Sequence, residues 1–394
     1  MSHTLEYHPM AHWNYLLIGG GMASAAAAQA ISQHQPSSSI AILTAEPHPP
    51  YKRPPLSKAL WKGASRDELW FTLNGNVQVH TACRAIELNL EAHTVLDERG
   101  ETHHYEKLLL ATGGTPRTPW GEGIIYFRTL DDYEQLRSVA DRGGHVLVIG
   151  GGFIGSEIAA ALASNGVAVT MLFPEDGIGA RMFPTALSSF LTEQYRARGV
   201  TVRTGETVAH LERHGSRWRA FTNSGASLEA DAVVAGLGIE PATQLASNAG
   251  LAIDNGIVVD EYLRTSHPDV YAAGDVVNFY CSPLGERIRV EHEDNALAQG
   301  ALAGENMTGA ARRYEYLPMF YSDLFEFGYE AVGLLDSRLE IVEEWREPYR
   351  EGVVYYCREG IVRGVLLWNV WERVEAARQL IAGRERAAAG AIEW

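Results

Sequence analysis

Two glycine-rich segments of the sequence have the spacing of a turn that binds a dinucleotide. They are Gly19-Gly20-Gly21 and Gly150-Gly151-Gly152, and each follows an apolar run and precedes a stretch of small residues. In such a turn one glycine reverses the chain and another lets the backbone approach a pyrophosphate, at a helix N-terminus whose N–H groups favour anions. A single turn of this kind is weak evidence, because it also arises for packing reasons. Two in one chain predict two nucleotide sites.

The first motif departs from the full pattern at its third glycine. Gly19 and Gly21 are in place, and Ser24 stands where the third glycine is usual, among alanines that keep the helix close to its strand. Glu46 follows the second strand, where an acidic side chain accepts hydrogen bonds from the ribose hydroxyls. The alternative is that Glu46 is a solvated turn residue.

The second motif is complete, and the residues after its second strand bear on which nucleotide it binds. Phe173 occupies the usual acidic position, and Glu175 follows two residues later. A carboxylate near the adenosine 2′ position would repel a 2′-phosphate, so Glu175 favours NADH over NADPH. Arg181 weakens this prediction, because its guanidinium group can bind the 2′-phosphate of NADPH. It can equally bind the pyrophosphate or the nicotinamide ribose.

A loop stiffened by prolines follows the first glycine turn and contains basic side chains. It reads Pro50-Tyr51-Lys52-Arg53-Pro54-Pro55-Leu56-Ser57-Lys58. Because proline fixes the backbone φ angle, the path of the loop is restricted, and so are the directions in which its basic side chains point. Arg53 and Lys58 are therefore candidate binding residues.

The elements that must position these residues occur twice, in the order strand, glycine turn, helix, strand. Hydrophobic patterning predicts a first set at Asn14–Ile18, Met22–Ile31 and Ile40–Leu43, and a second set at His145–Ile149, Phe153 to about Ser164, and Ala168–Phe173. Each set closes with another apolar run and glycines, Lys107–Gly114 and Ala232–Gly238. The repeat predicts an α/β chain with two Rossmann-like nucleotide-binding domains of glutathione reductase-like type.

Prolines and shifts in composition predict the domain boundaries. Pro116 and Pro119 mark the first crossover and Gly238–Pro241 the return, so the first domain is expected to be discontinuous, with residues 1–120 and 242–310. The second nucleotide domain is then 121–241. The remaining residues 311–394 predict a small α+β domain. Its expected strands are Tyr329–Leu335, Gly352–Tyr356 and Ile361–Trp368, followed by the amphipathic helix Trp371–Ile381.

Composition excludes several classes of function. The chain has 394 residues and a net charge of −16, which opposes binding to a phosphate backbone, so no nucleic-acid partner is expected. No apolar run approaches the roughly 20 residues of a membrane span. The first dozen residues lack a signal-peptide or transit pattern. We therefore expect no membrane association and a cytoplasmic location.

Several longer strings make the chain similar to a known family. RPPLSK, followed by ATGG, GGGFIGSE and AAGD at 272–275, resembles the FAD- and NADH-dependent ferredoxin reductases over essentially the whole chain. Within that superfamily the chain more closely resembles the apoptosis-inducing factors, through LFPE at 172–175, RVEH at 289–292, LAGENMTGA at 302–310, SDL at 322–324, GYEA at 328–331 and LWN at 367–369. The resemblance implies that the first domain binds FAD and the second binds NADH.

For FAD, the resemblance implies a catalytic pair and a set of contacts. Lys58 and Glu157 would form an ion pair beside flavin N5, and Asp275 would hold the ribitol. Glu291 and His292 open a helix whose N-terminus resembles the one that faces flavin N1 and O2, where reduced flavin is negatively charged. The other residues predicted to contact FAD are Gly19, Gly21, Ser24, Glu46, Arg53, Ala85, Thr112, Gly113, Arg128 and Tyr321, the last standing where the family has tryptophan.

For the nicotinamide nucleotide, the resemblance adds contacts from three parts of the chain. Phe153 and Ile154 match residues beside the nicotinamide. With the residues of the second motif, the predicted NAD site comprises Gly152, Phe153, Ile154, Glu157, Glu175, Arg181, Gly238, Glu291, Glu330 and Asn369.

The cysteines exclude one branch of this chemistry. Cys83, Cys281 and Cys357 lie far apart in sequence and form no C-x-x-C pair. A disulfide reductase of this build needs two neighbouring thiols that take electrons from the flavin. The electron acceptor is therefore expected to come from outside the chain. We expect the three cysteines to be buried packing residues, and we expect no metal site.

The regulatory features of the family's animal members are expected to be absent. Those members have an N-terminal mitochondrial segment, a β-hairpin insertion with aromatic residues that respond to NAD, and a long acidic loop in the C-terminal domain. This chain is short between Trp61 and Trp70 and between Asp336 and Gly352. Glu293 replaces a second histidine, and the acidic chain has no counterpart of a basic DNA-binding surface. Apoptotic, DNA-directed and mitochondrial-import roles are not carried over.

Three functions remain open on the sequence. The first is an FAD-dependent NADH:acceptor oxidoreductase of apoptosis-inducing-factor type, which transfers hydride from NADH to flavin N5 and forms a charge-transfer complex of reduced flavin and NAD. Its acceptor is a small quinone-like molecule, oxygen or an iron–sulfur protein. The second is an NADH:ferredoxin or rubredoxin reductase, whose docking face for an acidic carrier should be basic. The third is an NADH-sensing interaction protein with slow turnover, for example one that forms a homodimer when NADH binds.

Overall fold

The computed structural model describes residues 11–388 and 390–394, and the chain forms two compact units. Among the described residues, unit 1 contains 11–52, 67–115 and 241–318, and unit 2 contains 53–66, 116–240, 319–388 and 390–394. Two of the passages between the units run through the short strands β7 (Gly114–Pro116) and β15 (Ile239–Pro241), which pair with each other. In the described part of the chain, no helix has the length and apolar character of a membrane span.

A parallel sheet forms the centre of unit 1, with strand order β3-β2-β1-β6-β17. This is the order of a Rossmann half, in which the nucleotide lies at the carboxyl ends of the strands. Both faces of such a sheet are covered, so its strands read as continuous apolar runs. The strands are β1 (Ala11–Ile18), β2 (Ile40–Leu43), β3 (Val77–His80), β6 (Thr102–Leu110) and β17 (Val270–Ala272).

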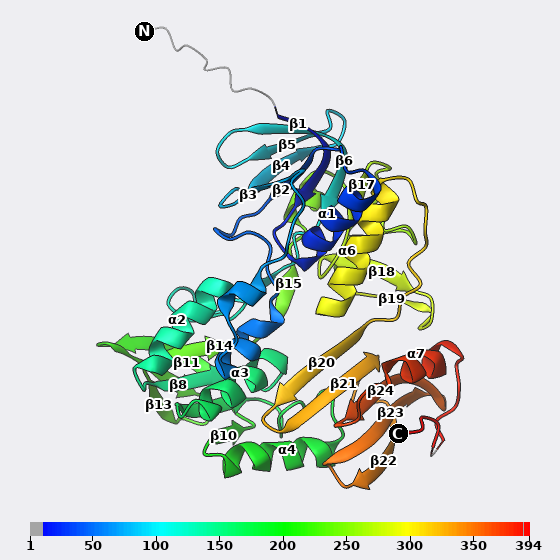
Figure 1. Ribbon diagram of the computed structural model, residues 1–394. Helices are drawn as coiled ribbons and strands as arrows, with labels where there is room; N and C mark the ends of the chain where they lie inside the picture. The colour runs from blue at the N-terminus through cyan, green and yellow to red at the C-terminus, as the bar shows by residue number, and fades with distance from the viewer. Residues whose placement is uncertain (1–10, 389) are drawn as a thin grey trace. The chain divides into compact units, whose positions relative to one another are not determined.

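Two helices of unit 1 that are far apart in sequence lie side by side, α1 (Met22–His34) and α6 (Glu293–Met307) (Figure 1). Their backbones approach closely because both are rich in small residues. A Cβ at Gly300 would lie 2.2 Å from the carbonyl oxygen of Ala23. Larger residues there would separate the two helices, and α6 would lose its position beside the first glycine turn.

An antiparallel extension of the unit 1 sheet was not predicted. Strands β4 (Ala85–Asn89) and β5 (Thr94–Asp97) fold back on the first half of β6, while the last residues of β6 pair with β17. A single strand thus belongs to both the parallel sheet and the antiparallel extension. Unit 1 also contains helix α5 (Gln244–Asn248) and the small sheet β16 (Ile257–Val258), β18 (Val277–Cys281) and β19 (Glu286–Ile288).

Unit 2 contains a second parallel sheet, with strand order β10-β9-β8-β14. It repeats the arrangement of unit 1, since the first strand of the motif again lies at the centre. Its strands are β8 (His145–Ile149), β9 (Ala168–Phe173), β10 (Thr201–Thr204) and β14 (Ala232–Ala235), and its helices are α2 (Leu130–Asp141), α3 (Phe153–Ser164) and α4 (Thr185–Ala197). A small antiparallel sheet follows, β11 (Val208–His214), β12 (Arg217–Thr222) and β13 (Ser227–Ala230).

The C-terminal part of unit 2 is a five-stranded antiparallel sheet with order β20-β21-β24-β23-β22. Its elements are β20 (Met319–Leu324), β21 (Phe327–Gly333), β22 (Glu340–Glu347), β23 (Glu351–Arg358), β24 (Ile361–Trp368) and the helix α7 (Val374–Ala382). Short 3-10 turns occur elsewhere in the chain at Pro54–Leu56, Ala59–Lys62 and Arg66–Leu69.

The predicted α/β class and both strand–turn–helix repeats are confirmed. The predicted bounds of β2, β8, α3, β9 and β24 coincide with the observed ones. The prediction of the last helix was wrong at its start, because α7 begins at Val374 and not at Trp371. Asn369 and Glu372 have φ angles of 53° and 60°, and this left-handed conformation is incompatible with a right-handed helix.

Candidate functional site

The first glycine turn connects β1 to α1 and is shaped to receive an anion. Gly19 has a φ angle of 115°, and a Cβ there would lie 2.1 Å from the carbonyl oxygen of Ala111. Gly21 is the N-cap of α1, and a Cβ there would meet no atom within 4 Å. No side chain of the described chain caps this helix, and its first turn has no acidic residue. Its N–H groups and dipole are therefore available to a pyrophosphate.

Buried polar atoms beside this turn fit a polar ligand. The hydroxyl of Ser24 and Nε2 of Gln299 are buried and make no hydrogen bond within the described residues. The other end of the Gln299 amide accepts a hydrogen bond from the Gly274 N–H at 2.9 Å. Because a buried polar atom without a partner is costly, both atoms suit a ligand with oxygen acceptors. The residues present therefore fit the FAD that the sequence predicts.

Two further predicted FAD residues have definite partners in unit 1. Glu46 follows β2 and is half-buried, and its Oε2 accepts a hydrogen bond from the Tyr51 hydroxyl at 2.6 Å. The carboxylate is thus held in place and is not a fully solvated turn residue. Thr112 follows β6, and its hydroxyl donates to the carbonyl oxygen of Ala242 at 2.8 Å. That bond ties the end of β6 to the returning chain.

The N-terminus of α6 gathers the predicted ribitol and flavin residues of unit 1. His292 is its N-cap, and Arg289 joins its neighbours by donating to the Asp275 carbonyl oxygen at 3.1 Å and pairing with Glu291 at 2.7 Å. Burial lowers the pKa of His292 to about 4, although the charge of Asp275 opposes the shift. The imidazole is therefore neutral at pH 7, so at this end of α6 it adds no positive charge to the helix dipole, and the first turn of the helix contains Glu293 and Asp294.

The second glycine turn, in unit 2, repeats the geometry of the first. Gly150 also has a φ angle of 115°, and a Cβ there would lie 2.4 Å from the carbonyl oxygen of Gly236. Gly152 is the N-cap of α3, where a Cβ would again meet no atom within 4 Å. The two turns thus share a glycine that close packing demands and a glycine that leaves space for a ligand.

A buried ion pair follows this turn in unit 2. Lys58 Nζ lies 2.6 Å from Glu157 Oε1, and the two side chains are 12% and 4% exposed. The predicted ion pair is therefore present. Because both groups are buried, removing either partner would leave the other as an unpaired buried charge, which destabilises the protein. The Lys58 ammonium also lies 5.3 Å from the ring centroid of Tyr321, so an aromatic face is available to the cation.

Two serines complete the coordination of the Glu157 carboxylate, and sequence reasoning missed both. Ser57 donates to Oε2 at 2.5 Å and Ser322 donates to Oε1 at 2.5 Å. With Lys58, these donors satisfy a carboxylate that water scarcely reaches. Ser57 lies beside a predicted residue in the loop, but the sequence separations from Glu157 are 100 and 165 residues. No local pattern joins them.

Large apolar side chains stay exposed at the start of α3. Phe153 and Ile154 are 39% and 36% exposed, and the Phe153 ring packs edge to face on Phe320 with centroids 5.3 Å apart. Such exposure suits a flat aromatic ligand. On the neighbouring strands, Tyr321 pairs in register with Glu330. Burial, and secondly the charge of Glu372, raise the pKa of Glu330.

The residue expected to discriminate between nucleotides lies in a fixed loop after β9. Glu175 forms an ion pair with Arg181 at 2.5 Å, and their side chains are 22% and 84% exposed. The loop is tied to the glycine turn, since the Gly179 N–H donates to the Gly151 carbonyl oxygen at 2.9 Å. Ser337 adds a second tie, because its hydroxyl donates to the Ala180 carbonyl oxygen at 2.7 Å. The Glu175 carboxylate is therefore positioned before any ligand binds.

The remaining predicted residues are placed as follows. Arg53 donates to the carbonyl oxygen of Arg128 at 3.0 Å. Asn369 uses its amide within unit 2, accepting from the Gly328 N–H and donating to the Arg350 carbonyl oxygen, both at 2.8 Å. In all, unit 1 contains Gly19, Gly21, Ser24, Glu46, Ala85, Thr112, Gly113, Asp275, Glu291 and His292, and unit 2 contains Arg53, Lys58, Arg128, Gly152, Phe153, Ile154, Glu157, Glu175, Arg181, Gly238, Tyr321, Glu330 and Asn369.

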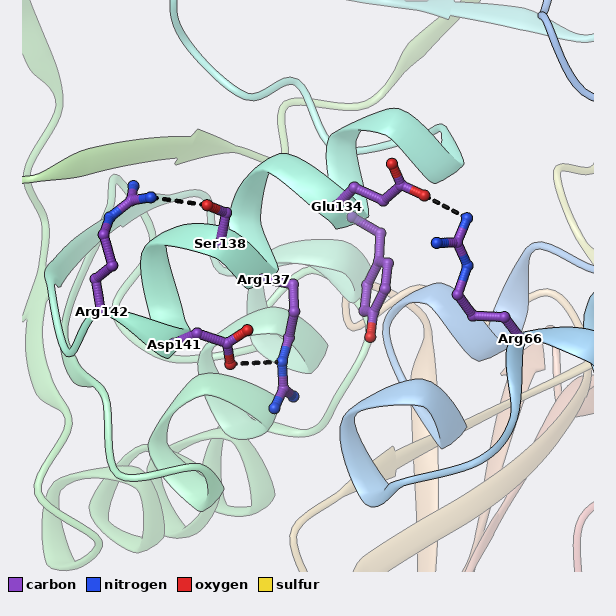
Figure 2. Close-up of a pocket in the computed structure, with 7 residues that line it drawn as sticks. Arg66, Glu134, Arg137, Ser138, Asp141 and Arg142 are labelled. Atoms are coloured by element: carbon purple, nitrogen blue, oxygen red, sulfur yellow. Dashed lines mark hydrogen bonds and ion pairs between the residues drawn. The ribbon is translucent and has the colours of Figure 1, made fainter.

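A surface groove on unit 2 contains none of the predicted site residues (Figure 2). Arg66 pairs with Glu134, and Arg137 pairs with Asp141 at 2.9 Å. Two of the three guanidinium groups are therefore neutralised locally, and the groove is not a strongly basic docking face. Its lining residues are Arg66, Tyr133, Glu134, Arg137, Ser138, Asp141 and Arg142.

We expect Gly21→Val to remove FAD binding while leaving the fold intact. The φ angle of −94° at Gly21 suits any residue, and the added side chain would occupy the open space where a pyrophosphate approaches. Flavin absorbance per chain should fall by at least about 10-fold, with little change in the thermal unfolding of the apoprotein. Gly75→Val, also in unit 1 with open space at its Cβ, is the matched control. Full flavin content in Gly21→Val would contradict the assignment.

Two family models match the chain. The model of the pyridine nucleotide-disulphide oxidoreductases matches residues 13–300. The model of the C-terminal domain of mitochondrion-associated apoptosis-inducing factor matches residues 303–348 and 342–383. Together these matches extend over both units.

Curated relatives and a solved structure agree with these models. The chain is 34% identical to apoptosis-inducing factor 1 of Dictyostelium discoideum, over 96% of this chain and 80% of that protein. It is 30% identical to a putidaredoxin reductase of Pseudomonas putida, over 94% of this chain and 92% of that protein. The structure of a ferredoxin reductase from Rhodopseudomonas palustris superposes with a TM-score of 0.87 at 29% identity, covering 95% of this chain and 96% of that one.

Proposed function

We propose that this chain, which belongs to the pyridine nucleotide-disulphide oxidoreductase family, is an FAD-dependent NADH:acceptor oxidoreductase of apoptosis-inducing-factor type. Family membership makes it an NAD(P)H-dependent flavoprotein oxidoreductase that uses FAD and NAD(H). The proposal adds the preference for NADH, the fate of the oxidised nucleotide and the residue roles. The observation that supports it most is the buried Lys58–Glu157 pair with its two serine donors.

Unit 1 would hold FAD by its first glycine turn and by the N-terminus of α6. The N–H groups after Gly21 would bind the pyrophosphate, Glu46 would accept hydrogen bonds from the ribose hydroxyls, and Asp275 would hold the ribitol. Neutral His292 and the α6 dipole would stabilise negative charge on the reduced ring. As part of the proposal, residues 1–120 and 242–310 form the FAD-binding domain, 121–241 the NADH-binding domain and 311–394 the C-terminal domain.

Unit 2 would hold NADH by the second glycine turn and orient its nicotinamide. Gly152 would admit the pyrophosphate, Phe153 and Ile154 would pack against the ring, and Glu157 would keep Lys58 in a fixed position. Bound FAD would supply the redox chemistry by accepting hydride at N5. The protein would contribute orientation, since hydride transfer needs reacting atoms about 3 to 3.5 Å apart. Lys58 would act as an aimed charge and not as a proton donor.

NADH is the proposed reductant because of the charge at the start of the loop after β9. Glu175 is held at 22% exposure by its pair with Arg181. A 2′-phosphate that approached this carboxylate would meet a like charge, which is unfavourable in a partly buried position. A small quinone-like molecule, oxygen and an iron–sulfur protein are all compatible with the site as electron acceptors.

An NADH:ferredoxin reductase is the second candidate, and the relatives support it. A putidaredoxin reductase and a ferredoxin reductase match nearly the whole chain. A reductase for an acidic iron–sulfur carrier needs a basic docking face. The net charge of −16 and the paired arginines of the unit 2 groove (Figure 2) do not favour such a face. We therefore rank this function second.

An anaerobic titration with NADH distinguishes the two candidates. For the first, we expect bleaching of the flavin with a broad long-wavelength charge-transfer band, because oxidised NAD stays stacked on the electron-rich reduced ring. Reaction with oxygen should then be slow. Bleaching without that band, together with fast reduction of an added ferredoxin, would favour the second candidate.

Size-exclusion chromatography of the same samples tests a third, sensing function. If NADH changed the apparent mass of the protein while turnover stayed slow with quinones, oxygen and ferredoxin, an NADH-dependent homodimer would replace the oxidoreductase as the proposed function. An unchanged elution volume, with steady turnover of one acceptor, is the result we expect.

A further inference from the structure

A buried polar cluster of unit 1 has no role in the proposed hydride transfer. Cys83, Asp97 and His103 are 1%, 0% and 1% exposed. Cys83 lies just before β4, Asp97 ends β5 and His103 is the second residue of β6. The cluster therefore joins the antiparallel extension to the strand that belongs to the main sheet. Cys83 is buried, as predicted, and its side chain contacts the Asp97 carboxylate.

The three side chains converge on one carboxylate oxygen. Cys83 Sγ lies 3.1 Å from Asp97 Oδ2, and His103 Nε2 lies 3.1 Å from the same atom. The three potential ligand atoms all lie within 4.8 Å of one another. In a tetrahedral zinc site with bonds of about 2.0 to 2.3 Å, ligand atoms are separated by about 3.2 to 3.8 Å. Only small displacements therefore separate the observed geometry from coordination.

The other oxygen of Asp97 is held by the backbone. The N–H groups of Arg99 and Glu101 both donate to Oδ1 at 2.9 Å. These bonds fix the plane of the carboxylate and direct Oδ2 toward the thiol and the imidazole. Hydrogen bonds of this kind are how proteins orient a metal-binding carboxylate before the metal arrives.

A second imidazole, that of His80, lies near the three. His80 ends β3, and its ring centroid lies 5.7 Å from that of His103. Its Nε2 is buried and makes no hydrogen bond within the described residues. A buried nitrogen without a hydrogen-bond partner destabilises the folded protein. His80 stands outside the group of three whose ligand atoms lie within 4.8 Å of one another, so its ring must move toward them before it can act as a fourth donor.

We propose that Cys83, Asp97 and His103 bind one zinc ion, and that the nearby His80 ring moves to become the fourth ligand. Thiolate, imidazole and carboxylate together suit zinc, whereas magnesium and calcium prefer oxygen ligands. On binding, the Cys83 thiol loses its proton to solvent and the sulfur–zinc bond forms without any change of oxidation state. Zinc has no redox chemistry, so the ion acts as a structural link between β3, β5, β6 and the segment before β4.

Without metal, the same residues form a hydrogen-bonded network. Burial, and secondly the hydrogen bond to Asp97, raise the pKa of the Cys83 thiol to about 12. Although burial alone would raise the pKa of Asp97, the hydrogen bonds from Cys83, His103 and the backbone lower it to about 2. The metal-free cluster is therefore a neutral thiol that donates to a carboxylate. This network without zinc is the alternative that an experiment must exclude.

Metal content per chain tests the proposal. Untagged holoprotein produced in zinc-supplemented medium and dialysed against metal-free buffer should retain one zinc per chain by mass spectrometry. Cys83→Ser and His103→Gln should each reduce retained zinc by at least about 10-fold. Cys281→Ser removes another buried free cysteine of unit 1 and should retain the full amount. Wild-type protein without zinc, or equal loss in Cys281→Ser, would overturn the proposal.

An X-ray absorption spectrum at the zinc edge keeps the test decisive if a variant loses its flavin or its fold. The wild-type protein should show one sulfur at about 2.3 Å and nitrogen or oxygen neighbours at about 2.0 to 2.2 Å. A spectrum without sulfur would place the zinc elsewhere and would overturn the assignment to Cys83.

Discussion

Glu157→Gln should slow the reduction of flavin by NADH by about 10²-fold while the protein stays folded and yellow. Glutamine keeps the shape of the side chain and can still bond to Ser57 and Ser322, but it removes the charge that holds Lys58 at 2.6 Å. Misplacing an aimed group by about 1 Å costs on the order of 10² in rate. Stopped-flow measurement of flavin bleaching under anaerobic conditions gives the rate directly.

Two comparisons make this result interpretable. Glu193→Gln breaks an exposed pair with Arg196 in the same unit, so its rate should equal that of the wild type. Ser322→Ala leaves the ion pair but removes one donor to Oε1, and we expect an intermediate loss. If Glu157→Gln reduced flavin at the wild-type rate, the ion pair would have only a structural role.

The variant Glu175→Ser should admit NADPH. Removing the carboxylate frees the Arg181 guanidinium, to which it is paired at 2.5 Å, and replaces a like charge by a potential partner for a 2′-phosphate. We expect the ratio of the second-order rate constants for NADH and NADPH to fall by about 10- to 100-fold, equivalent to about 1.4 to 2.8 kcal/mol. Stopped-flow reduction with each nucleotide, at several concentrations, measures the ratio.

Asp176→Asn is the matched control for this variant, because it removes a neighbouring exposed charge from the same loop. Its nucleotide preference should stay that of the wild type. The double variant Glu175→Ser with Arg181→Ser should use NADPH poorly, since the guanidinium is then absent. An unchanged ratio in Glu175→Ser would mean that another group selects the nucleotide.

The two predictions concern different steps, so the result for one variant does not determine the result for the other. Loss of rate in Glu157→Gln with both nucleotides would reflect the orientation of the reacting groups. A change of preference in Glu175→Ser would reflect binding at the adenosine end. Either result leaves the zinc proposal untouched, because that cluster lies in unit 1 while both variants lie in unit 2.

The glycine turns could be predicted from the sequence because their conformation depends on residues that are close together in the chain. Gly19 and Gly150 each begin a strand-to-helix turn, and the φ angle of 115° at both is a property of that turn. The strands read as apolar runs because both faces of a parallel sheet are buried. Residues within a few positions of each other therefore determined the two Rossmann repeats, and longer strings such as RPPLSK indicated the family.

Other features depend on contacts between distant segments, which only the tertiary structure determines. The serines that donate to Glu157 lie 100 and 165 residues away in sequence. No sequence pattern around an isolated serine predicts such a distant partner. Likewise, Cys83, Asp97 and His103 come together only because β5 folds back on β6. The sequence determined which segments can bind nucleotides. The pairing of strands decided which buried polar groups meet, because a buried charge or thiol is stabilised only by the partners that the fold brings to it.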